Sequence, residues 1–288
     1  MTAELNKMKI NRVVKQRFSA LFVYLLLTVF ALFFIIPFLW IVSTSLKGDS
    51  QIFTIPPLWI PDHFHWENYV NVFKRIPFFM YLKNSVFITT VSIIGTVLSS
   101  SLVAYAFGCL QWKGRDTLFV LVLVTMMMPA QVIMIPVFVL FKEIGWLNTF
   151  KPLTIPAFLG GGAFNIFLLR QFFMTIPKDL LDSARLDGCS EFRIYWNIVL
   201  PLAKPALATV SILTFMFSWN DFLGPLIYLS DKTKGTIALG LGTFVGQHVT
   251  EWSLLMAASF LMMLPMLVIF FVFQKYFIQG FMMSGLKD

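Results

Sequence analysis

Long runs of mostly apolar residues alternate with shorter polar segments along most of this 288-residue chain. The first run extends from Phe18 to Val42, and about 20 such residues are enough to cross a bilayer as a helix. Five further runs lie at about 84–107, 117–141, 152–173, 206–229 and 252–273. The pattern therefore predicts an all-α integral membrane protein with six transmembrane helices.

The basic residues indicate how these helices are oriented. Residues 1–17 carry five of them, and most other Lys and Arg residues fall in segments that six spans place on the same side. The first apolar run is longer than the core of a signal peptide and lacks a small-residue cleavage site. By the positive-inside rule we expect a cytoplasmic N-terminus over residues 1–17, a transmembrane domain over residues 18–288, and a cytoplasmic C-terminus.

Proline and glycine mark breaks inside the predicted spans. Pro129 and Pro136 should interrupt the third span, and Gly160, Gly161 and Gly162 would allow local unwinding or close helix contact in the fourth. Residues 46–83, 142–151 and 230–251 should be external, with a short helix at residues 66–74.

Composition supports a membrane protein and argues against a nucleic-acid-binding one. The chain is 58% hydrophobic and 12% charged, with a mean hydropathy of +0.80, which is too apolar for an ordinary soluble protein of this size. Its net charge of +8 comes from basic residues at the ends of apolar segments. Nucleic-acid binding would instead favour a basic stripe.

No catalytic or metal-binding pattern is evident. Cys109 and Cys189 have no disulfide or metal spacing, and nothing near His63 and His65 completes a coordination shell. A Gly-Lys dipeptide is absent, so the chain has no P-loop for ATP, and the His-Glu-x-x-His and Gly-x-Ser-x-Gly motifs are absent too. We therefore expect no catalytic residue, no metal and no bound cofactor in this chain.

The interval at residues 174–205 mixes charged and apolar residues at helical spacing. Pro177 and Asp179 suit the start of a helix over Lys178–Leu186, and Gly188 can end it in the left-handed conformation. Ser190 is a candidate N-cap for a second helix. Its apolar stripe runs before Pro201 and Pro205 interrupt it and consists of Phe192, Tyr195, Trp196, Val199 and Leu200. Two such helices at a membrane surface predict a docking element.

The same interval resembles the EAA loop of ABC-importer permeases, whose pattern is Glu-Ala-Ala, three residues, Gly, nine residues and Ile-x-Leu-Pro. Gly188 and the segment from Ile198 to Pro201 agree with it in type and spacing. The first two positions differ, because Asp182 replaces Glu and Ser183 replaces Ala. In addition, the segment around Trp219 resembles a motif of the carbohydrate (maltose-type) branch of these permeases.

This resemblance implies a type I ABC importer permease fold with a cytoplasmic coupling helix, in the cell membrane of a bacterium or archaeon. The expected partners are a second permease subunit, two ATP-binding subunits that hold ATP and Mg²⁺, and an extracellular or periplasmic solute-binding protein. The chain itself would be a sugar permease and not an enzyme. The residues expected to couple to the ATPase are Asp182, Ser183, Ala184, Asp187, Gly188, Ile198, Leu200 and Pro201.

Polar groups inside the spans are candidates for the translocation path, because each must be paired or face a polar cavity. These are Asn165 in the fourth span and Asn220 and Asp221 in the fifth. Trp219 would offer a stacking surface to a sugar. Alternatively, Asp221 makes an interhelical hydrogen bond or lies near the outer interface.

Three other functions stay open at this point. An ABC importer for a polyol phosphate such as glycerol-3-phosphate would have the same loop. A gradient-driven transporter or channel would need several buried titratable groups, and the spans offer Asp221. An integral-membrane enzyme would need a cluster of catalytic groups at one membrane face, which His63, His65 and His248 do not form.

Overall fold

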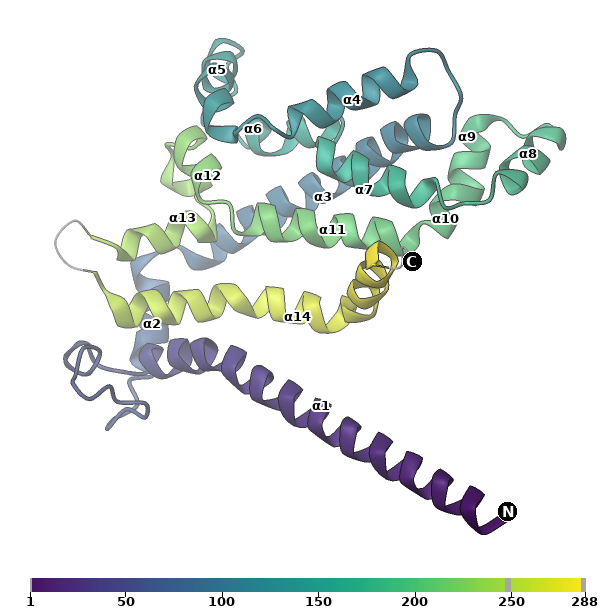
Figure 1. Cartoon of the computed structure of the whole chain (residues 1–288). Coiled ribbons are helices and arrows are strands. Elements are labelled where there is room, and N and C mark those ends of the chain that lie inside the picture. Colours follow the sequence, from purple (N-terminus) through teal and green to yellow (C-terminus); the bar gives the residue numbers. More distant parts are fainter. Residues whose placement is uncertain (1, 247–249, 286–288) are drawn as a thin grey trace. The chain divides into compact units, whose positions relative to one another are not determined.

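The computed structural model describes residues 2–246 and 250–285, with side chains for residues 17, 19–246 and 250–275. In these ranges the chain consists of helices joined by turns, which confirms the predicted all-α class (Figure 1). It divides into two compact units, one within residues 1–72 and 244–261 and the other within residues 73–243 and 262–288.

The first unit is built around the end of helix α1 (Thr2–Ser45). The apolar 18-residue window of its segment Ser19–Ser45 has no buried residue within this chain, whereas Thr44 and Ser45 at its end are buried. The turn after α1 is held by Asn68, whose Nδ2 donates to the carbonyl oxygens of Ser45 and Lys47 at 2.9 Å each. Asn68 belongs to α2 (Glu67–Arg75), which confirms the short helix predicted there. The unit also holds the 3-10 helix η1 (Asp49–Gln51) and the start of α14 (Trp252–Gly285), whose Ser253 Oγ donates to Asp49 Oδ1.

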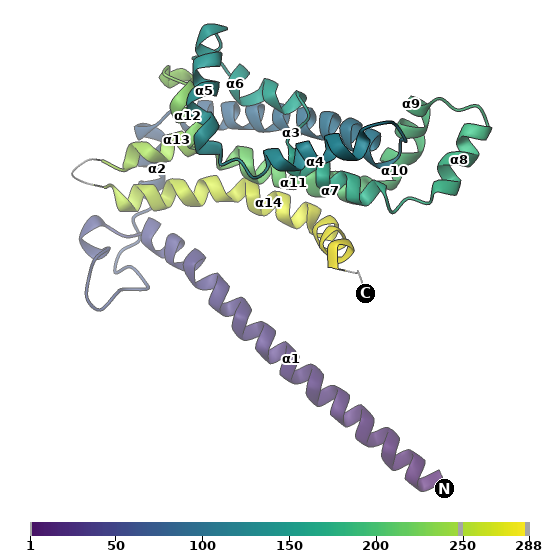
Figure 2. The same cartoon turned by 45° about the horizontal axis from the view of Figure 1, so that its top comes forward.

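The second unit is organised around α3 (Phe78–Gly108). Helices α7 (Ala163–Phe173) and α11 (Lys204–Trp219) run beside α3 in both views (Figures 1 and 2). The other elements before residue 178 are α4 (Arg115–Thr125), α5 (Ala130–Glu143), α6 (Lys151–Thr154) and the 3-10 helix η2 (Ile155–Phe158). After α11 follow α12 (Leu223–Tyr228), η4 (Lys232–Lys234), α13 (Ile237–Leu241) and η5 (Gly242–Phe244), the last of which crosses the boundary between the units.

The glycine triplet at residues 160–162 interrupts the helix at the position that the sequence predicted. All three glycines have positive φ, and α7 begins directly after them at Ala163. Gly161 lies so close to α3 that a Cβ on it would be 2.7 Å from the Thr96 carbonyl oxygen. The break therefore also brings the backbone against α3, and both predicted uses of these glycines are confirmed.

The two proline predictions in the third span have different outcomes. The chain bends by 95° between α4 and α5, and Pro129 occupies the N-cap position of α5. Pro136 lies inside α5 without ending it, so the predicted interruption there is wrong. A single proline removes one backbone hydrogen bond, and a helix in an apolar setting can continue past such a loss.

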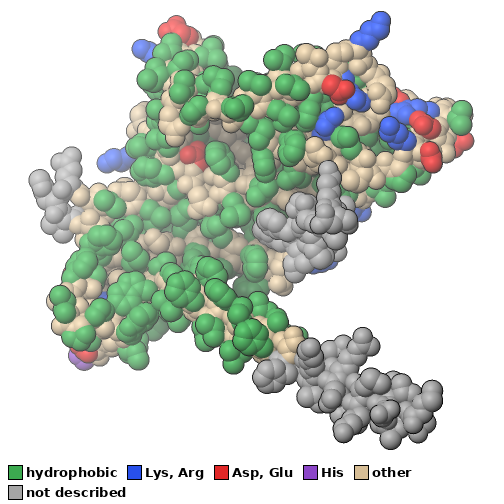
Figure 3. Space-filling view, in the orientation of Figure 1, with side chains coloured by type: hydrophobic (Ala, Val, Ile, Leu, Met, Phe, Trp, Pro, Cys, Tyr) green, Lys and Arg blue, Asp and Glu red, His purple; other side chains and the backbone are tan. Residues whose placement is uncertain are grey.

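Four helical segments among the described residues are long and apolar enough to cross a membrane, and the number rises to as many as six if each of two sharply bent helix pairs forms one span. In the fifth predicted span, α11 ends at Trp219 and residues 220–222 separate it from α12. Many large apolar side chains are exposed, and Figure 3 shows them over much of the visible surface. Such a surface suits lipid or other membrane chains as its surroundings.

Candidate functional site at residues 174–205

The first helix of the predicted docking element, α8, spans Lys178–Leu186, as the sequence predicted. Pro177 precedes it and Asp179 lies in its first turn. Its apolar residues point in different directions, since Leu181 and Ala184 are buried whereas Leu180 is 43% and Leu186 91% exposed. The helix thus rests on the rest of the unit through a small face and leaves two leucines uncovered.

The turn after α8 is a Schellman motif closed by Gly188. Gly188 has φ +77°, its N–H donates to the Arg185 carbonyl, and the Cys189 N–H donates to the Ala184 carbonyl, both at 3.0 Å. This pair of hydrogen bonds is the standard way to satisfy the last carbonyls of a helix, and it places glycine at the left-handed position. The predicted role of Gly188 is confirmed.

The second helix begins as predicted but is not a regular α-helix. Ser190 Oγ accepts from the Arg193 N–H at 3.4 Å and caps α9 (Glu191–Ile194). A π-helix at Tyr195–Val199 and α10 (Leu200–Leu202) follow, and the helix is then interrupted at Ala203. Pro201 lies inside α10, so the predicted interruption there is wrong, whereas Pro205 falls in the first turn of α11.

The structure divides the predicted apolar stripe into two rows. Tyr195 and Val199 are buried, but Phe192 is 67% and Trp196 54% exposed, and these two rings stack with their centroids 6.3 Å apart. Part of the predicted stripe therefore packs inward, and the element exposes an aromatic pair.

Charged and polar side chains join the two helices to α3. Arg185 donates from Nε to Glu191 Oε1 at 2.7 Å and from Nη1 to Asp182 Oδ1 at 2.6 Å. Tyr105, on α3, donates from its hydroxyl to Glu191 Oε2 at 2.5 Å. Glu191 therefore lies at the junction of α8, α9 and α3.

The electrostatics of this junction favour ionised partners. Its hydrogen bonds to Glu191 and Asp182 raise the pKa of Arg185 above its ordinary value, and the Arg185 guanidinium lowers the pKa of Glu191. Glu191 lies outside the fifth span predicted at residues 206–229. Nearby, burial raises the pKa of the Cys109 thiol to about 11, so this cysteine stays protonated at neutral pH.

The residues predicted to couple to an ATPase do not all face outward. Asp182, Ser183, Asp187, Gly188 and Pro201 are exposed, Ile198 and Leu200 are half-buried, and Ala184 is buried. Ala184 therefore packs inward, while the others form or border an exposed surface. Glu191, Arg185 and Tyr105 were not predicted from the sequence. The i, i+3 spacing of Asp182 and Arg185 carries a signal for an ion pair on one helix, whereas Glu191 and Tyr105 belong to other helices.

The four residues predicted for the translocation path all have partners within this chain. Asn165 Nδ2 donates to the Gly161 carbonyl at 2.7 Å, Asn220 Nδ2 to the Met216 carbonyl at 2.7 Å, and Asp221 Oδ1 accepts from the Gly224 N–H at 2.9 Å. Trp219 is 3% exposed and stacks on Phe215, and its Nε1 donates to the Met262 carbonyl. This packing leaves Trp219 little surface on which a sugar could stack.

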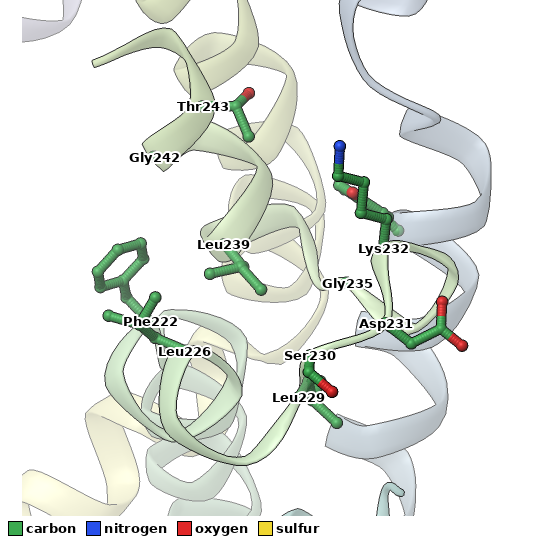
Figure 4. A pocket seen from close by; sticks show the side chains of 11 residues that line it. Phe222, Leu226, Leu229, Ser230, Asp231, Lys232, Gly235, Leu239, Gly242 and Thr243 are labelled. Carbon is green, nitrogen blue, oxygen red and sulfur yellow. The ribbon is translucent and has the colours of Figure 1, made fainter. Parts of the chain in front are cut away.

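A separate recess of about 310 Å³ lies at the other end of α3 (Figure 4). Tyr81, Phe222, Leu226 and Leu239 give it an apolar lining, and Asp231 and Lys232 are among its polar residues. None of the predicted path residues lines it. In the histidine-containing segment, His65 Nδ1 hydrogen-bonds to Glu67 Oε1, and the described residues hold no group of three potential metal ligands.

Comparison with known proteins connects this loop to a family. Residues 100–283, which include the whole of residues 174–205, match the model of the binding-protein-dependent transport system inner membrane component family. The chain belongs to this family. It is thus a permease component of an ABC importer, as the sequence predicted.

Individual relatives in this family have similar lengths. The arabinooligosaccharides transport system permease protein AraQ of Halalkalibacterium halodurans is 33% identical over 256 residues, covering 88% of this chain and 91% of that protein. The sn-glycerol-3-phosphate transport system permease protein UgpE of Yersinia pestis bv. Antiqua (strain Antiqua) is 33% identical over 269 residues, covering 90% and 95%.

A solved structure supports the same fold. A chain of a bacterial ABC transporter that imports the acidic polysaccharide alginate aligns with a TM-score of 0.77 and 25% identity, over 91% of this chain and 97% of that one. The match confirms the predicted ABC-importer permease fold.

Proposed function

We propose that this chain is one of two permease subunits of an ATP-driven carbohydrate importer, and that residues 174–205 receive the force from the ATPase subunits. The observation that carries this proposal is the helix–turn–helix at residues 178–202. It exposes Asp182, Leu186 and Asp187 and is tied to α3 through Glu191. An element with an exposed docking face and an internal connection to a membrane span can transmit motion between the two.

ATP and Mg²⁺ would bind to the partner subunits. This chain has no Gly-Lys dipeptide and hence no P-loop to hold phosphates. Closure of the ATPase subunits would move α8–α10 as a lever, and the spans would tilt so that a central path opens alternately to each side. An external solute-binding protein would deliver the substrate.

The proposed substrate is a mono- or oligosaccharide. The names of two relatives support an oligosaccharide or polysaccharide, because AraQ is named for arabinooligosaccharides and the matched solved transporter imports alginate. The name of UgpE supports the alternative, a polyol phosphate such as glycerol-3-phosphate. Asn165, Asn220 and Asp221 would offer hydroxyl-binding groups to either class if they line the path.

The proposed location is the cell membrane of a bacterium or archaeon, with both termini cytoplasmic. The basic residues 7, 9, 12, 15 and 17 at the N-terminal end of the first span support this orientation. It places residues 174–205 in the cytoplasm, where the ATPase subunits would meet them.

Gentle purification of this chain from its native membrane, followed by mass spectrometry, tests the assembly. Recovery of a P-loop ATPase and a second permease supports the proposal. Recovery of this chain alone, still transporting in vesicles without ATP, contradicts it and favours a gradient-driven transporter. Uptake of labelled arabinooligosaccharide against labelled glycerol-3-phosphate by vesicles that hold the full complex then separates the two substrate classes.

A further inference from the structure

Glu191 connects three helices through one carboxylate. Its Oε1 accepts from Arg185 Nε at 2.7 Å, and its Oε2 accepts from the Tyr105 hydroxyl at 2.5 Å and from Arg185 Nη2 at 3.3 Å. Arg185 is on α8, Glu191 on α9 and Tyr105 on α3. Because both carboxylate oxygens are used, a change at any one partner alters the geometry of the other two.

Helix α8 is also attached by apolar packing. Its two buried residues, Leu181 and Ala184, belong to the buried cluster that includes residues of α3 and α9. Arg185 is the residue of α8 that reaches both Glu191 and, at 3.5 Å, the Cys109 carbonyl beyond the end of α3. Hydrogen bonds between ionised partners are shorter and stronger than neutral ones, and a guanidinium binding a carboxylate through two nitrogens also fixes direction. The Arg185–Glu191 pair therefore sets the orientation of α8.

A second connection lies one helical turn away on α3. The hydroxyls of Ser101 and Tyr195 share a buried hydrogen bond of 2.7 Å, and the rings of Tyr105 and Tyr195 lie 5.4 Å apart. Residues four apart on a helix lie on the same face. Two attachments on one face of α3 hold the second helix, and the one through Glu191 continues to α8 by way of Arg185.

We propose that Glu191 is a positioning residue that, through Arg185 and Tyr105, makes α8 and α3 move together when the ATPase subunits close. This rests on the function proposed above, since it assigns the connection by which residues 174–205 act on the membrane spans. Arg185 transmits displacement of α8 to Glu191, and Tyr105 transmits it to α3. Because α7 and α11 pack along α3, the displacement reaches the centre of this unit.

The test measures a change at the end of α3 that lies away from Tyr105, and it needs no substrate. Lys83 is exposed near the start of α3, away from Tyr105. In the full complex, with Cys109 and Cys189 replaced by Ser, the variant Lys83→Cys is labelled with fluorescein maleimide in the nucleotide-free state and after trapping with ATP and vanadate. The measured quantity is the ratio of the two labelling rates, together with the amount of trapped nucleotide.

The expected result is a several-fold ratio in the otherwise unchanged complex and a ratio close to one in Glu191→Gln, with trapped nucleotide unchanged in both. Tyr105→Phe should also lower the ratio, although its ring keeps its contact with Tyr195. The labelling-rate ratio of the double variant should be no lower than that of Glu191→Gln, because both changes break the same connection.

Asp116→Asn is the matched control. It also removes one carboxylate, which lies 2.9 Å from Arg115 Nε and 3.8 Å from Arg170 Nη2 and outside the Glu191 contacts, and its ratio should not change. An unchanged ratio in Glu191→Gln would overturn the proposal. If that variant fails to assemble, an unchanged ratio in Tyr105→Phe would overturn it. If the complex traps nucleotide but its two labelling rates are equal before either substitution is made, that result would instead contradict the function proposed for residues 174–205.

Discussion

At the scale of single residues, substitution of Gly188 tests whether the turn after α8 affects stability through its backbone conformation alone. A Cβ at Gly188 would meet nothing within 4 Å, yet its φ is +77°. Gly188→Ala should therefore lower the free energy of unfolding by about 1–2 kcal/mol purely through backbone strain. Thermal unfolding of the detergent-solubilised complex measures this, and co-purification measures retention of the ATPase.

The matched variant is Gly188→Asn, since asparagine tolerates the left-handed conformation better than alanine does. Gly188→Asn should have a higher free energy of unfolding than Gly188→Ala, and it should co-purify with more ATPase. Equal losses for the two variants would show that the side chain, and not the backbone conformation, is the cause.

Lys47 provides a second prediction for a single residue. It is fully buried, its Nζ lies 4.1 Å from the centroid of the Trp40 ring, and it makes no hydrogen bond with the residues that the structure describes. Replacing a buried charge by an apolar side chain of similar size is often neutral or stabilising. Lys47→Met should thus leave the free energy of unfolding unchanged or raise it by up to about 3 kcal/mol, whereas Lys47→Ala, which creates a cavity, should lower it by about 2 kcal/mol.

The same residue predicts a pH effect. Burial lowers the pKa of Lys47 below its ordinary value of 10.5, so the unfolded chain binds this proton more tightly than the folded one. Stability attributable to Lys47 should therefore increase as pH rises from below the folded pKa toward 10.5. Thermal unfolding at neutral and alkaline pH should show this increase in the unchanged protein, and Lys47→Met should lack that part of it.

At the scale of helices, the glycine break before α7 determines how closely this segment approaches α3. Gly160 and Gly161 both have positive φ, but a Cβ on Gly161 would lie 2.7 Å from the Thr96 carbonyl, whereas one on Gly160 would come no closer than 3.9 Å to Ile166. Both alanine variants should lose about 1–2 kcal/mol to strain, and Gly161→Ala about 1–3 kcal/mol more to overpacking. Thermal unfolding of the two variants measures the difference, and equal midpoints would contradict the close packing.

At the scale of the whole molecule, the proposed topology places residue 62 outside and residue 113 inside. Cysteine substitutions Asp62→Cys and Lys113→Cys, in a background where Cys109 and Cys189 are replaced by Ser, can be labelled in intact cells with an impermeant maleimide. Asp62→Cys should react at once, and Lys113→Cys only after the membrane is opened. The reverse order would mean that residues 174–205 face outward and cannot meet a cytoplasmic ATPase.

Features that depend on neighbouring residues could be predicted from the amino-acid sequence. Apolar runs of spanning length, the bounds of α8, the left-handed turn at Gly188 and the cap at Ser190 follow from local periodicity, backbone preference and capping. The family resemblance rested on the same segment. Such features could be predicted because each is stabilised within a few residues.

Features that depend on distant partners could be established only from the folded chain. Tyr105 and Glu191 are 86 positions apart, and Trp219 is buried against Met262, which is 43 positions away. Phe192 and Trp196 are exposed, whereas Tyr195 is buried and shares a hydrogen bond with Ser101 on α3. No local pattern encodes these pairings, because they arise when residues 191–199 pack on α3 and when α11 meets α14, which brings residues from separate parts of the chain into contact.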